Sequence, residues 1–300
     1  MNILVTGAAG LLGANILYLL RDSHNIVGMD RNPMAISRTI TVVSQLQDMQ
    51  LLGKIIDKYQ IKTVIHCAAM TNVDECERHP QQAVLVNKDL VDQIVLLCAR
   101  KQVKVVFISS DAVYNGELTE LHKETEVATP VSVYGKTKLA AENIVLSNRN
   151  NLVFRTNMYG FNYREKESFS EWIIKQLSQD AQLNMFYDCL FSPLLVNTLV
   201  DLINQAIKKD LSGLYNLCAT GSISKYQMGC IIKNVFSLEG TINRVSMDDF
   251  CFFAPRTHNM GMDNSKIQKD LGVSIETIED GVRKYYELCQ EGYKNKLRNM

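Results

Sequence analysis

The sequence has few of the features that mark extracellular, metal-binding or membrane-spanning proteins. Its eight cysteines are scattered, none is spaced as Cys-x-x-Cys, and several lie in apolar runs, so we expect them to be reduced and mostly buried. No apolar run reaches the length of a membrane-spanning helix, and the N-terminus shows no secretory signal pattern. We therefore expect a cytoplasmic protein with no metal site and no membrane partner.

The chain also lacks an excess of either charge. It has 32 Lys and Arg residues against 32 Asp and Glu residues, and the formal net charge is zero. Because binding to a polyanion depends on clustered basic residues, we expect no nucleic-acid partner. What the chain does have is 46% hydrophobic residues over a length of 300, which is enough to bury a large core.

A glycine-rich loop near the N-terminus lies in a recognisable context. The pattern consists of an apolar run (residues 2–6), a loop with Gly7, Gly10 and Gly13, a predicted helix over about residues 11–21, and a second apolar run (residues 25–30) that ends in Asp30. A strand, a glycine turn, a helix and an acid about 20 residues on are typical of a dinucleotide-binding unit. In such a unit the helix N-terminus holds the pyrophosphate.

The residues around this loop predict NAD(H) or NADP(H) as the cofactor. Asp30 would accept hydrogen bonds from the adenosine ribose, which favours NAD. Arg31 could instead hold the 2′-phosphate of NADP, or it could be a solvated loop charge, and both readings stay open. The predicted cofactor contacts are Gly7, Gly10, Leu11, Leu12, Gly13, Asp30, Arg31, Ala68, Ala69, Met70, Asn87, Tyr134 and Lys138.

Apolar runs that alternate with helical stretches predict an α/β fold with a doubly wound, parallel Rossmann sheet. Further strands are expected at residues 39–43, 63–67, 105–110, 152–156 and 214–217. Residues 1–160 should form the cofactor domain, completed by segments near residues 193–217, including a helix that opens at Ser192-Pro193. Residues 161–300 should form mainly a small, interleaved C-terminal α/β lobe that binds the substrate.

Tyr134 and Lys138 lie four residues apart in a stretch predicted to be helical, so they share one helix face. A Lys ammonium beneath the phenol would lower the pKa of Tyr134, which could then transfer a proton to a carbonyl oxygen. Tyr-x-x-x-Lys is also common on surface helices, so the spacing alone does not establish a site. Ser110, at the carboxyl end of a predicted strand, is expected at the edge of the sheet where ligands bind.

Together these motifs resemble the extended short-chain dehydrogenase/reductase superfamily, and within it the dTDP-4-dehydrorhamnose reductases and related nucleotide-sugar reductases. The narrower resemblance rests on four segments: residues 68–77, 109–116 and 133–139, and Pro255-Arg256 with Asp263-Asn264-Ser265-Lys266 downstream. It implies that Tyr134 donates a proton to the sugar C4 carbonyl, that Lys138 binds the nicotinamide ribose, and that Ser110 hydrogen-bonds the same carbonyl oxygen. The substrate contacts expected from the resemblance are Ser110, Asp111, Ala112, Asn157, Met158 and Arg256. A homodimer is expected because relatives are often dimers.

The chain departs from the reductase family at two positions. The family usually has an aromatic residue after the acid at 111 and a Trp at the position of Met158, but here the first position holds Ala112. The sugar and the nucleotide therefore stay open. A dehydratase is disfavoured, because Ala112 also stands where those enzymes place a catalytic Glu. A nucleotide-sugar epimerase with retained NAD and a non-catalytic, NAD(P)-binding regulatory subunit stay as alternatives to a 4-keto nucleotide-sugar reductase.

Overall fold

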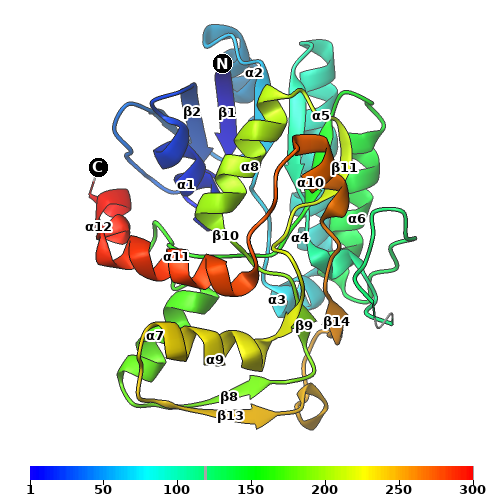
Figure 1. Ribbon diagram of the computed structural model, residues 1–300. Helices are drawn as coiled ribbons and strands as arrows, with labels where there is room; N and C mark the ends of the chain where they lie inside the picture. Colours follow the sequence, from blue (N-terminus) through cyan, green and yellow to red (C-terminus); the bar gives the residue numbers. More distant parts are fainter. Residues whose placement is uncertain (118–119, 300) are drawn as a thin grey trace.

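A parallel, seven-stranded sheet lies at the centre of the computed structural model, which describes residues 1–117 and 120–299 (Figure 1). In spatial order the strands are β11 (Gly213–Asn216), β6 (Leu152–Arg155), β5 (Lys104–Ile108), β4 (Thr63–His66), β1 (Asn2–Thr6), β2 (Asn25–Asp30) and β3 (Ile40–Val43). From the boundary between β1 and β4, strands β1, β2 and β3 follow one another outward in chain order on one side, and strands β4, β5, β6 and β11 do so on the other. This topology confirms the predicted doubly wound α/β fold, in which ligands bind at the carboxyl ends of the strands near that boundary.

Helices cover both faces of the sheet because successive strand residues point to opposite faces. In β1, Ile3 and Val5 pack against one set of helices, whereas Leu4 packs against the other. The first set includes α1 (Leu11–Leu20) and α8 (Val196–Lys208), and the second includes α2 (Met49–Lys58), α5 (Leu90–Arg100) and α6 (Val133–Leu146). No helix among the described residues is both long and apolar enough to cross a membrane.

A smaller group of elements lies beyond the carboxyl edge of the sheet, at the bottom of Figure 1. It contains α7 (Phe169–Ser178), β8 (Gln182–Phe186), β9 (Leu190–Phe191), β12 (Ile223–Ser224), α9 (Lys225–Val235), β13 (Thr241–Val245) and β14 (Asn259–Met260). Strands β8 and β13 form a parallel pair, and β9 lies between β12 and β14. We call this group the lower lobe; its behaviour as a separate unit stays a prediction.

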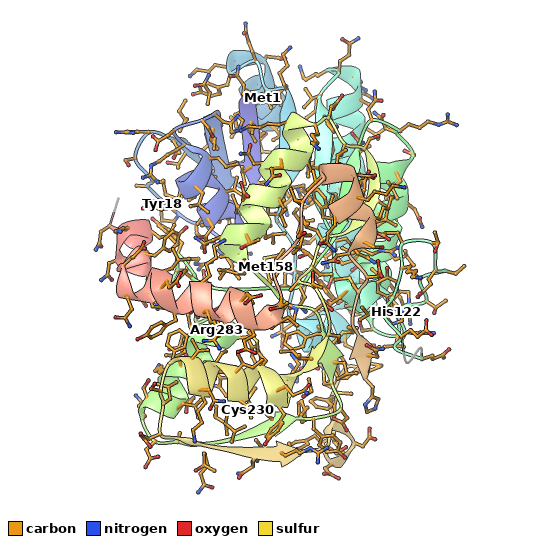
Figure 2. The ribbon with its side chains drawn as sticks, in the orientation of Figure 1. Met1, Tyr18, His122, Met158, Cys230 and Arg283 are labelled. Atoms are coloured by element: carbon orange, nitrogen blue, oxygen red, sulfur yellow. The ribbon has the colours of Figure 1, made fainter. Side chains whose placement is uncertain are left out.

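The remaining elements connect these parts or cap them. They are α3 (Val73–Arg78), α4 (Pro80–Val84), a π-helical turn (Leu85–Asp89), 3₁₀ turns (Asp111–Val113 and Met247–Asp249), β7 (Met158–Tyr159), β10 (Leu194–Leu195), α10 (Ser265–Leu271), α11 (Ile278–Gln290) and α12 (Tyr293–Arg298). Figure 2 places Met158, at the start of β7, between the central sheet and the lower lobe.

The helix predicted to open at Ser192-Pro193 begins later than expected, at Val196. Residues 194 and 195 instead form β10, which pairs in parallel with β7. The Leu194 N–H donates to the Asn157 carbonyl at 2.9 Å, so it serves this pair and not a helix. The short pair fixes the chain that leaves β6, and with it the side chain of Asn157 at the edge of the sheet.

Candidate active site

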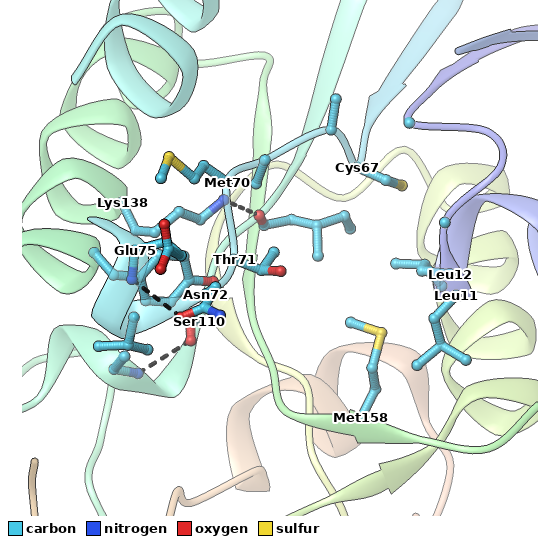
Figure 3. A pocket seen from close by; sticks show the side chains of 18 of the residues that line it. Leu11, Leu12, Cys67, Met70, Thr71, Asn72, Glu75, Ser110, Lys138 and Met158 are labelled. Carbon is cyan, nitrogen blue, oxygen red and sulfur yellow. Dashed lines mark hydrogen bonds between the residues drawn. The ribbon is translucent and has the colours of Figure 1, made fainter. Parts of the chain in front are cut away.

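One pocket of about 1390 Å³ runs along the carboxyl edge of the sheet and between the sheet and the lower lobe. Pockets of roughly 300–1,000 Å³ hold one drug-sized ligand, so this volume is large enough for two ligands side by side. In Figure 3, Leu11 and Leu12 lie on one side of the pocket, and Lys138 and Ser110 lie on the opposite side. The glycine loop and the Tyr-x-x-x-Lys helix therefore face a common space.

The glycine loop leaves no room for side chains where β1 meets the end of β4. A Cβ at Gly7 would lie 2.6 Å from the backbone nitrogen of Ala68, and Gly7 has a φ of +69°, which favours glycine. A Cβ at Gly13 would lie 2.3 Å from the carbonyl oxygen of Gly7. Helix α1 begins after Gly10 without a side-chain cap, so its N-terminus can receive a pyrophosphate. These residues fit a dinucleotide.

Asp30 lies at the end of β2, beside the glycine loop. One carboxylate oxygen accepts a hydrogen bond from the Ala9 N–H at 3.0 Å, and the other accepts from the Asn32 N–H at 2.8 Å. Arg31 is exposed, and it lines the pocket together with Asp30. The backbone thus fixes the Asp30 carboxylate at the end of the pocket where an adenosine ribose would lie.

Asn87 was predicted to contact the cofactor, but it is not among the residues that line the pocket. Its side chain is buried and comes from the π-helical turn between α4 and α5. The Asn87 amide accepts from the Met70 N–H at 2.8 Å and donates to the Met70 carbonyl at 3.0 Å. Asn87 therefore reaches the pocket only through Met70, whose backbone it holds in place.

Helix α6 starts at the pocket because its first turn packs directly on the turn after β5. The hydroxyl of Ser132 caps the helix by accepting from the Gly135 N–H at 3.2 Å. A Cβ at Gly135 would lie 2.2 Å from the Ala112 carbonyl oxygen, so only glycine allows this approach. The contact turns Tyr134 toward the pocket, next to the end of β5.

Lys138, one turn further along α6, is buried and reaches the pocket from behind Tyr134. Its ammonium donates to the Ile108 carbonyl at 2.6 Å, drawn as a dashed line in Figure 3, and lies 4.1 Å from the centre of the Phe107 ring. Burial lowers the pKa of Lys138 to about 8, while the charge of Glu142 acts in the opposite direction.

The pKa of Tyr134 differs from the predicted direction. Burial raises the pKa of the phenol above its ordinary value, a hydrogen bond with Ser110 opposes this shift, and the charge of Asp111 adds to it. The prediction that the pKa of Tyr134 is lowered was therefore wrong. The cost of burying the charged phenolate outweighs the hydrogen bond that lowers this pKa. Tyr134 is therefore a protonated phenol at neutral pH.

Ser110, Asp111 and Asn157 form a hydrogen-bonded group at the adjacent ends of β5 and β6. The Ser110 hydroxyl donates to one Asp111 carboxylate oxygen at 2.9 Å, and the Asn157 amide donates to the other at 2.6 Å. Burial raises the pKa of Asp111, whereas these two hydrogen bonds lower it. Ala112 and Met158 line the pocket beside this group, so the structure brings these five predicted substrate residues together.

Arg256 lines the pocket where the lower lobe meets α3. Its guanidinium pairs with the Asp74 carboxylate at 2.7 Å and lies 5.3 Å from the centre of the Phe252 ring. The Ala254 N–H donates to the same carboxylate at 3.0 Å. Asp74 thus holds the segment that carries Arg256 against α3.

Several pocket residues were missed in the sequence. Lys225, at the start of α9, lies 4.6 Å and 4.8 Å from the ring centres of Phe169 and Phe191, and it lines the pocket with Phe186 and Phe252. The Ser224 capping box predicts a helix start at Lys225, but nothing in the local pattern points toward the pocket. Only the packing of the lower lobe brings these residues to the site.

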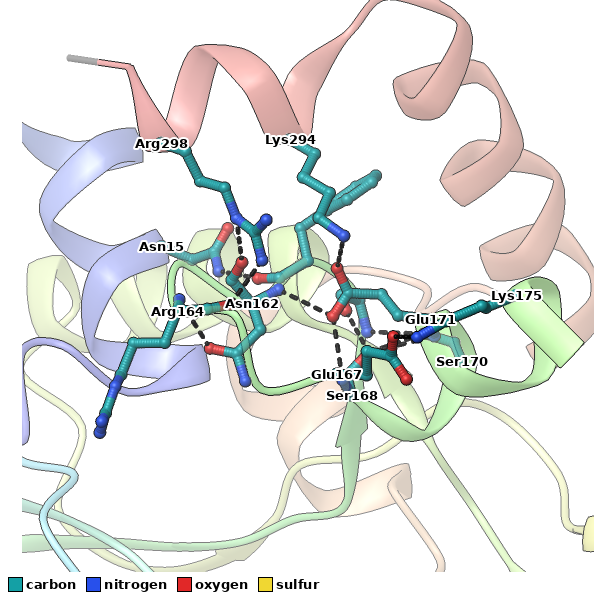
Figure 4. Close-up of polar contacts among 12 residues, drawn as sticks. Asn15, Asn162, Arg164, Glu167, Ser168, Ser170, Glu171, Lys175, Lys294 and Arg298 are labelled. Atoms are coloured by element: carbon teal, nitrogen blue, oxygen red, sulfur yellow. Dashed lines mark hydrogen bonds and ion pairs between the residues drawn. The ribbon is translucent and has the colours of Figure 1, made fainter.

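Residues 162–168 form another wall of the pocket that the sequence did not indicate. Figure 4 shows how α12 holds this wall: Arg298 donates to the Asn162 carbonyl at 3.1 Å and to the Arg164 carbonyl at 2.5 Å. Lys294 pairs with the buried Glu171 at 2.7 Å, and Glu171 in turn accepts from the backbone of the same wall. The wall is therefore held by residues more than 120 positions away in the chain.

Comparison with known families and curated proteins agrees with this geometry. The family described as "RmlD substrate binding domain" matches residues 1–290. The probable low-salt glycan biosynthesis reductase Agl14 of Haloferax volcanii is 26% identical over 93% of this chain and 95% of its own length. The dTDP-4-dehydrorhamnose reductase of Salmonella typhimurium is 25% identical over 95% of this chain and 96% of its own. Subunit beta of methionine adenosyltransferase 2 from Xenopus tropicalis is 27% identical over 91% and 83%.

A solved structure shows the same fold. The dTDP-4-dehydrorhamnose reductase of Bacillus anthracis, crystallised in complex with NADP, superposes with a TM-score of 0.86. It shares 23% sequence identity, and the match covers 95% of this chain and 98% of that one. At this level of identity, the likeness establishes the architecture.

Proposed function

Because this chain belongs to the RmlD substrate-binding domain family, we propose that it is an oxidoreductase that uses NAD(P)H to reduce the 4-keto group of a nucleotide-linked deoxysugar. The observation that carries the proposal is the single pocket that joins the glycine loop to Tyr134, Lys138 and Ser110. A dinucleotide bound at the loop and a carbonyl bound beside Tyr134 would meet inside this pocket.

The chemistry follows from the groups on the side of the pocket that holds Tyr134. The nicotinamide, when bound, supplies the hydride that adds to the carbonyl carbon. The Tyr134 phenol is protonated at neutral pH, so it has a proton to give to the carbonyl oxygen, which then becomes an alcohol. Ser110, next to Tyr134, would hydrogen-bond the same oxygen and stabilise the charge that develops there. Lys138 would hold the nicotinamide ribose.

The opposite side of the pocket offers cationic and aromatic groups for the nucleotide. Arg256 and Lys225 both line it, and a sugar nucleotide carries its negative charge on a diphosphate that such groups bind well. Phe186 and Phe252 lie at the same end, where a flat base could stack. Asp111 and Asn157 would hold the sugar between the two ends.

The test is cofactor oxidation with a panel of substrates. Purified protein is mixed with NADH or NADPH and with dTDP-, GDP-, UDP- and CDP-linked 4-keto-6-deoxy sugars, and the absorbance of the reduced cofactor is followed. We expect oxidation with at least one member, and its identity assigns the sugar and the nucleotide. Absence of oxidation with every member overturns the reductase proposal, and NAD that co-purifies tightly with the protein points to an epimerase instead.

A second candidate is a non-catalytic NAD(P)-binding subunit, favoured by the similarity to subunit beta of methionine adenosyltransferase 2. Such a protein would bind the cofactor and turn over none of the keto sugars. The two candidates therefore separate when cofactor binding and turnover are measured on the same preparation. The cytoplasmic location and the homodimer stay predictions, and light scattering after size exclusion tests the dimer.

A further inference from the structure

A buried ion pair lies where α6, the helix that carries Tyr134 and Lys138, packs against the end of β6. Arg155, the last residue of β6, contacts both carboxylate oxygens of Glu142: its Nη2 lies 2.7 Å from Oε2, and its Nε lies 3.1 Å from each oxygen. Their side chains are only 4% and 1% exposed, and neither residue is among those that line the pocket. Burying two charges is costly and gives little net stability, so the pair calls for a further explanation.

The ion pair is hydrogen-bonded to Ser109, the middle residue of the segment 108–110 at the end of β5. The Ser109 hydroxyl donates to Glu142 at 2.5 Å. On one side of Ser109, the Ile108 carbonyl accepts from the Lys138 ammonium. On the other side is Ser110, whose hydroxyl lies close enough to Tyr134 to lower the pKa of the phenol. Three consecutive residues at the end of β5 thus contact three residues of α6 in turn: Lys138, Glu142 and Tyr134.

The spacing on α6 explains how one helix reaches all three. Tyr134, Lys138 and Glu142 are four residues apart, so they lie on one face of α6, which packs along the end of β5. Tyr134 and Lys138 project into the pocket, whereas Glu142, one turn further, meets the ion-pair partner from β6. Glu142 therefore bonds the face of α6 that carries Tyr134 and Lys138 to the ends of β5 and β6.

Arg155 extends this bonding to the loop that follows the active-site turn. Its Nη1 donates to the Tyr114 hydroxyl at 2.9 Å, and that hydroxyl donates to the Asn216 side chain at 3.0 Å. Tyr114 follows Asp111 by three residues and is buried. The network therefore fixes both the start and the end of the turn that carries Ser110 and Asp111.

We propose that Glu142 is a positioning residue that, through Ser109, aligns Ser110 and Lys138 with Tyr134 for proton transfer. This inference rests on the reductase function proposed above. A shift of about 1 Å in a reacting group lowers rates by as much as 10²-fold, so removal of one such bond is expected to appear in kcat.

The charge of Glu142 has a second consequence for Lys138. The titratable groups that face the Lys138 ammonium are Glu142 on its own helix and the neighbouring His66 and Cys67 at the end of β4. His66 has a pKa lowered to about 3 and Cys67 has a pKa raised to about 12, so both are neutral near pH 7. Glu142 is therefore the negative charge that supports the protonated form of Lys138.

Three variants separate alignment, charge and simple stability. Ser109→Ala removes the link but leaves the ion pair intact. Glu142→Gln keeps the shape of the side chain but removes its charge. Asn151→Ala is the matched control: Asn151 joins the same two elements at their other end, accepting from the Val105 N–H at 2.9 Å and donating to the Val145 carbonyl at 3.0 Å.

Each variant is measured in three ways: melting temperature, NAD(P)H affinity by fluorescence titration between pH 6 and 10, and kcat with the substrate identified in the panel assay. We expect Ser109→Ala to lower kcat about tenfold or more and to leave the pH midpoint of cofactor binding unchanged. Glu142→Gln should move that midpoint down by about one pH unit or more. Asn151→Ala should lower the melting temperature without affecting either readout.

The proposal is overturned if Ser109→Ala and Glu142→Gln match Asn151→Ala in kcat and in the pH midpoint. If Glu142→Gln does not fold because Arg155 is left unpaired, the double variant Glu142→Gln/Arg155→Gln takes its place. Loss of the Arg155 charge partly offsets loss of the Glu142 charge, so the midpoint should shift in the same direction by a smaller amount. The pH dependence of cofactor binding requires no turnover. A chain that binds NAD(P)H but reduces no keto sugar therefore contradicts the proposed function while the charge effect of Glu142 is still tested.

Discussion

The two sides of the pocket are built in different ways. The cofactor side is shaped by backbone: the glycine loop, the bare N-terminus of α1, and the Met70 backbone held by the Asn87 amide. The substrate side is shaped by long side chains, including the partly exposed Arg256 and aromatic residues of the lower lobe. Backbone geometry tolerates few substitutions, whereas long side chains can be exchanged. The comparison predicts that changes on the cofactor side disable the protein and that changes on the substrate side retune it.

Tyr134→Phe should give the largest effect on activity. The substitution removes the proton donor and keeps the ring, so kcat should fall by about 10²–10⁴-fold. Binding of NAD(P)H, measured by fluorescence titration, should change little because the glycine loop is untouched. Turnover equal to that of the wild type would contradict the assigned role of the phenol.

Gly7→Ala should give the largest effect on structure at the cofactor side. The substitution combines left-handed backbone strain with a clash against Ala68, and we expect a loss of more than about 2 kcal/mol together with most of the dinucleotide affinity. Gly272→Ala is the matched control, because Gly272 has nearly the same φ of +68° and no atom closer than 3.9 Å.

Gly272→Ala should lower the free energy of unfolding only by the backbone strain, about 1–2 kcal/mol, and should bind the cofactor normally. Urea unfolding and cofactor titration of both variants measure the two quantities. Equal losses of affinity in the two variants would show that the close approach to Ala68 is unimportant.

Lys138→Met should stabilise the fold while it impairs activity. The pKa of Lys138 is lowered from 10.5 to about 8, so folding at neutral pH carries the cost of burying a charge, about 1.4 kcal/mol per pKa unit. Between pH 8 and pH 10.5 the folded wild type releases this proton while the unfolded chain keeps it. Wild-type stability therefore rises toward that of the variant over this range.

Urea unfolding of both proteins at pH 7 and at pH 10 measures this difference in the free energy of unfolding. The difference should be largest at pH 7 and shrink at pH 10, and comparison with the wild type cancels the titration of other groups. A variant less stable than the wild type at both pH values would show that the charge of Lys138 is not a burden on the fold.

Asp74→Asn should have the smallest effect, confined to the substrate side. The side chains of Asp74 and Arg256 are 31% and 28% exposed, and pairs of this kind contribute about 0.2–1 kcal/mol. We expect KM for the sugar nucleotide to rise about two- to fivefold, with kcat and cofactor affinity unchanged. Glu279→Gln, which breaks the exposed pair with Arg283 on α11, is the control and should leave KM unaffected.

The same contrast explains what could be predicted from the sequence. The doubly wound fold and the glycine loop were predictable because strand, turn and helix are local patterns. The position of Lys138 was predictable, but the pKa of Tyr134 was not, because desolvation depends on every segment that packs around the phenol. Glu142 lies four residues beyond Lys138 in the sequence, but its ion-pair partner Arg155 lies on strand β6, and no local pattern joins the two.

The substrate side was largely hidden. Arg256 was predicted, but Asp74, which holds it, lies 182 residues away in the chain. Lys225 and the wall at residues 162–168 reach the pocket only through the packing of the lower lobe and α12. No local pattern encodes contacts over such separations, so a sequence read in short windows does not find them.

Helix α12 has a consequence for the order in which the protein matures during synthesis. Chains fold from the N-terminus as they leave the ribosome, and the sheet strands and the glycine loop are complete by residue 216. The pocket wall at residues 162–168 nevertheless depends on Lys294 and Arg298, which emerge well after those elements. A nascent chain can therefore form its glycine loop before this wall is held in place, so the pocket is finished only once α12 has been synthesised.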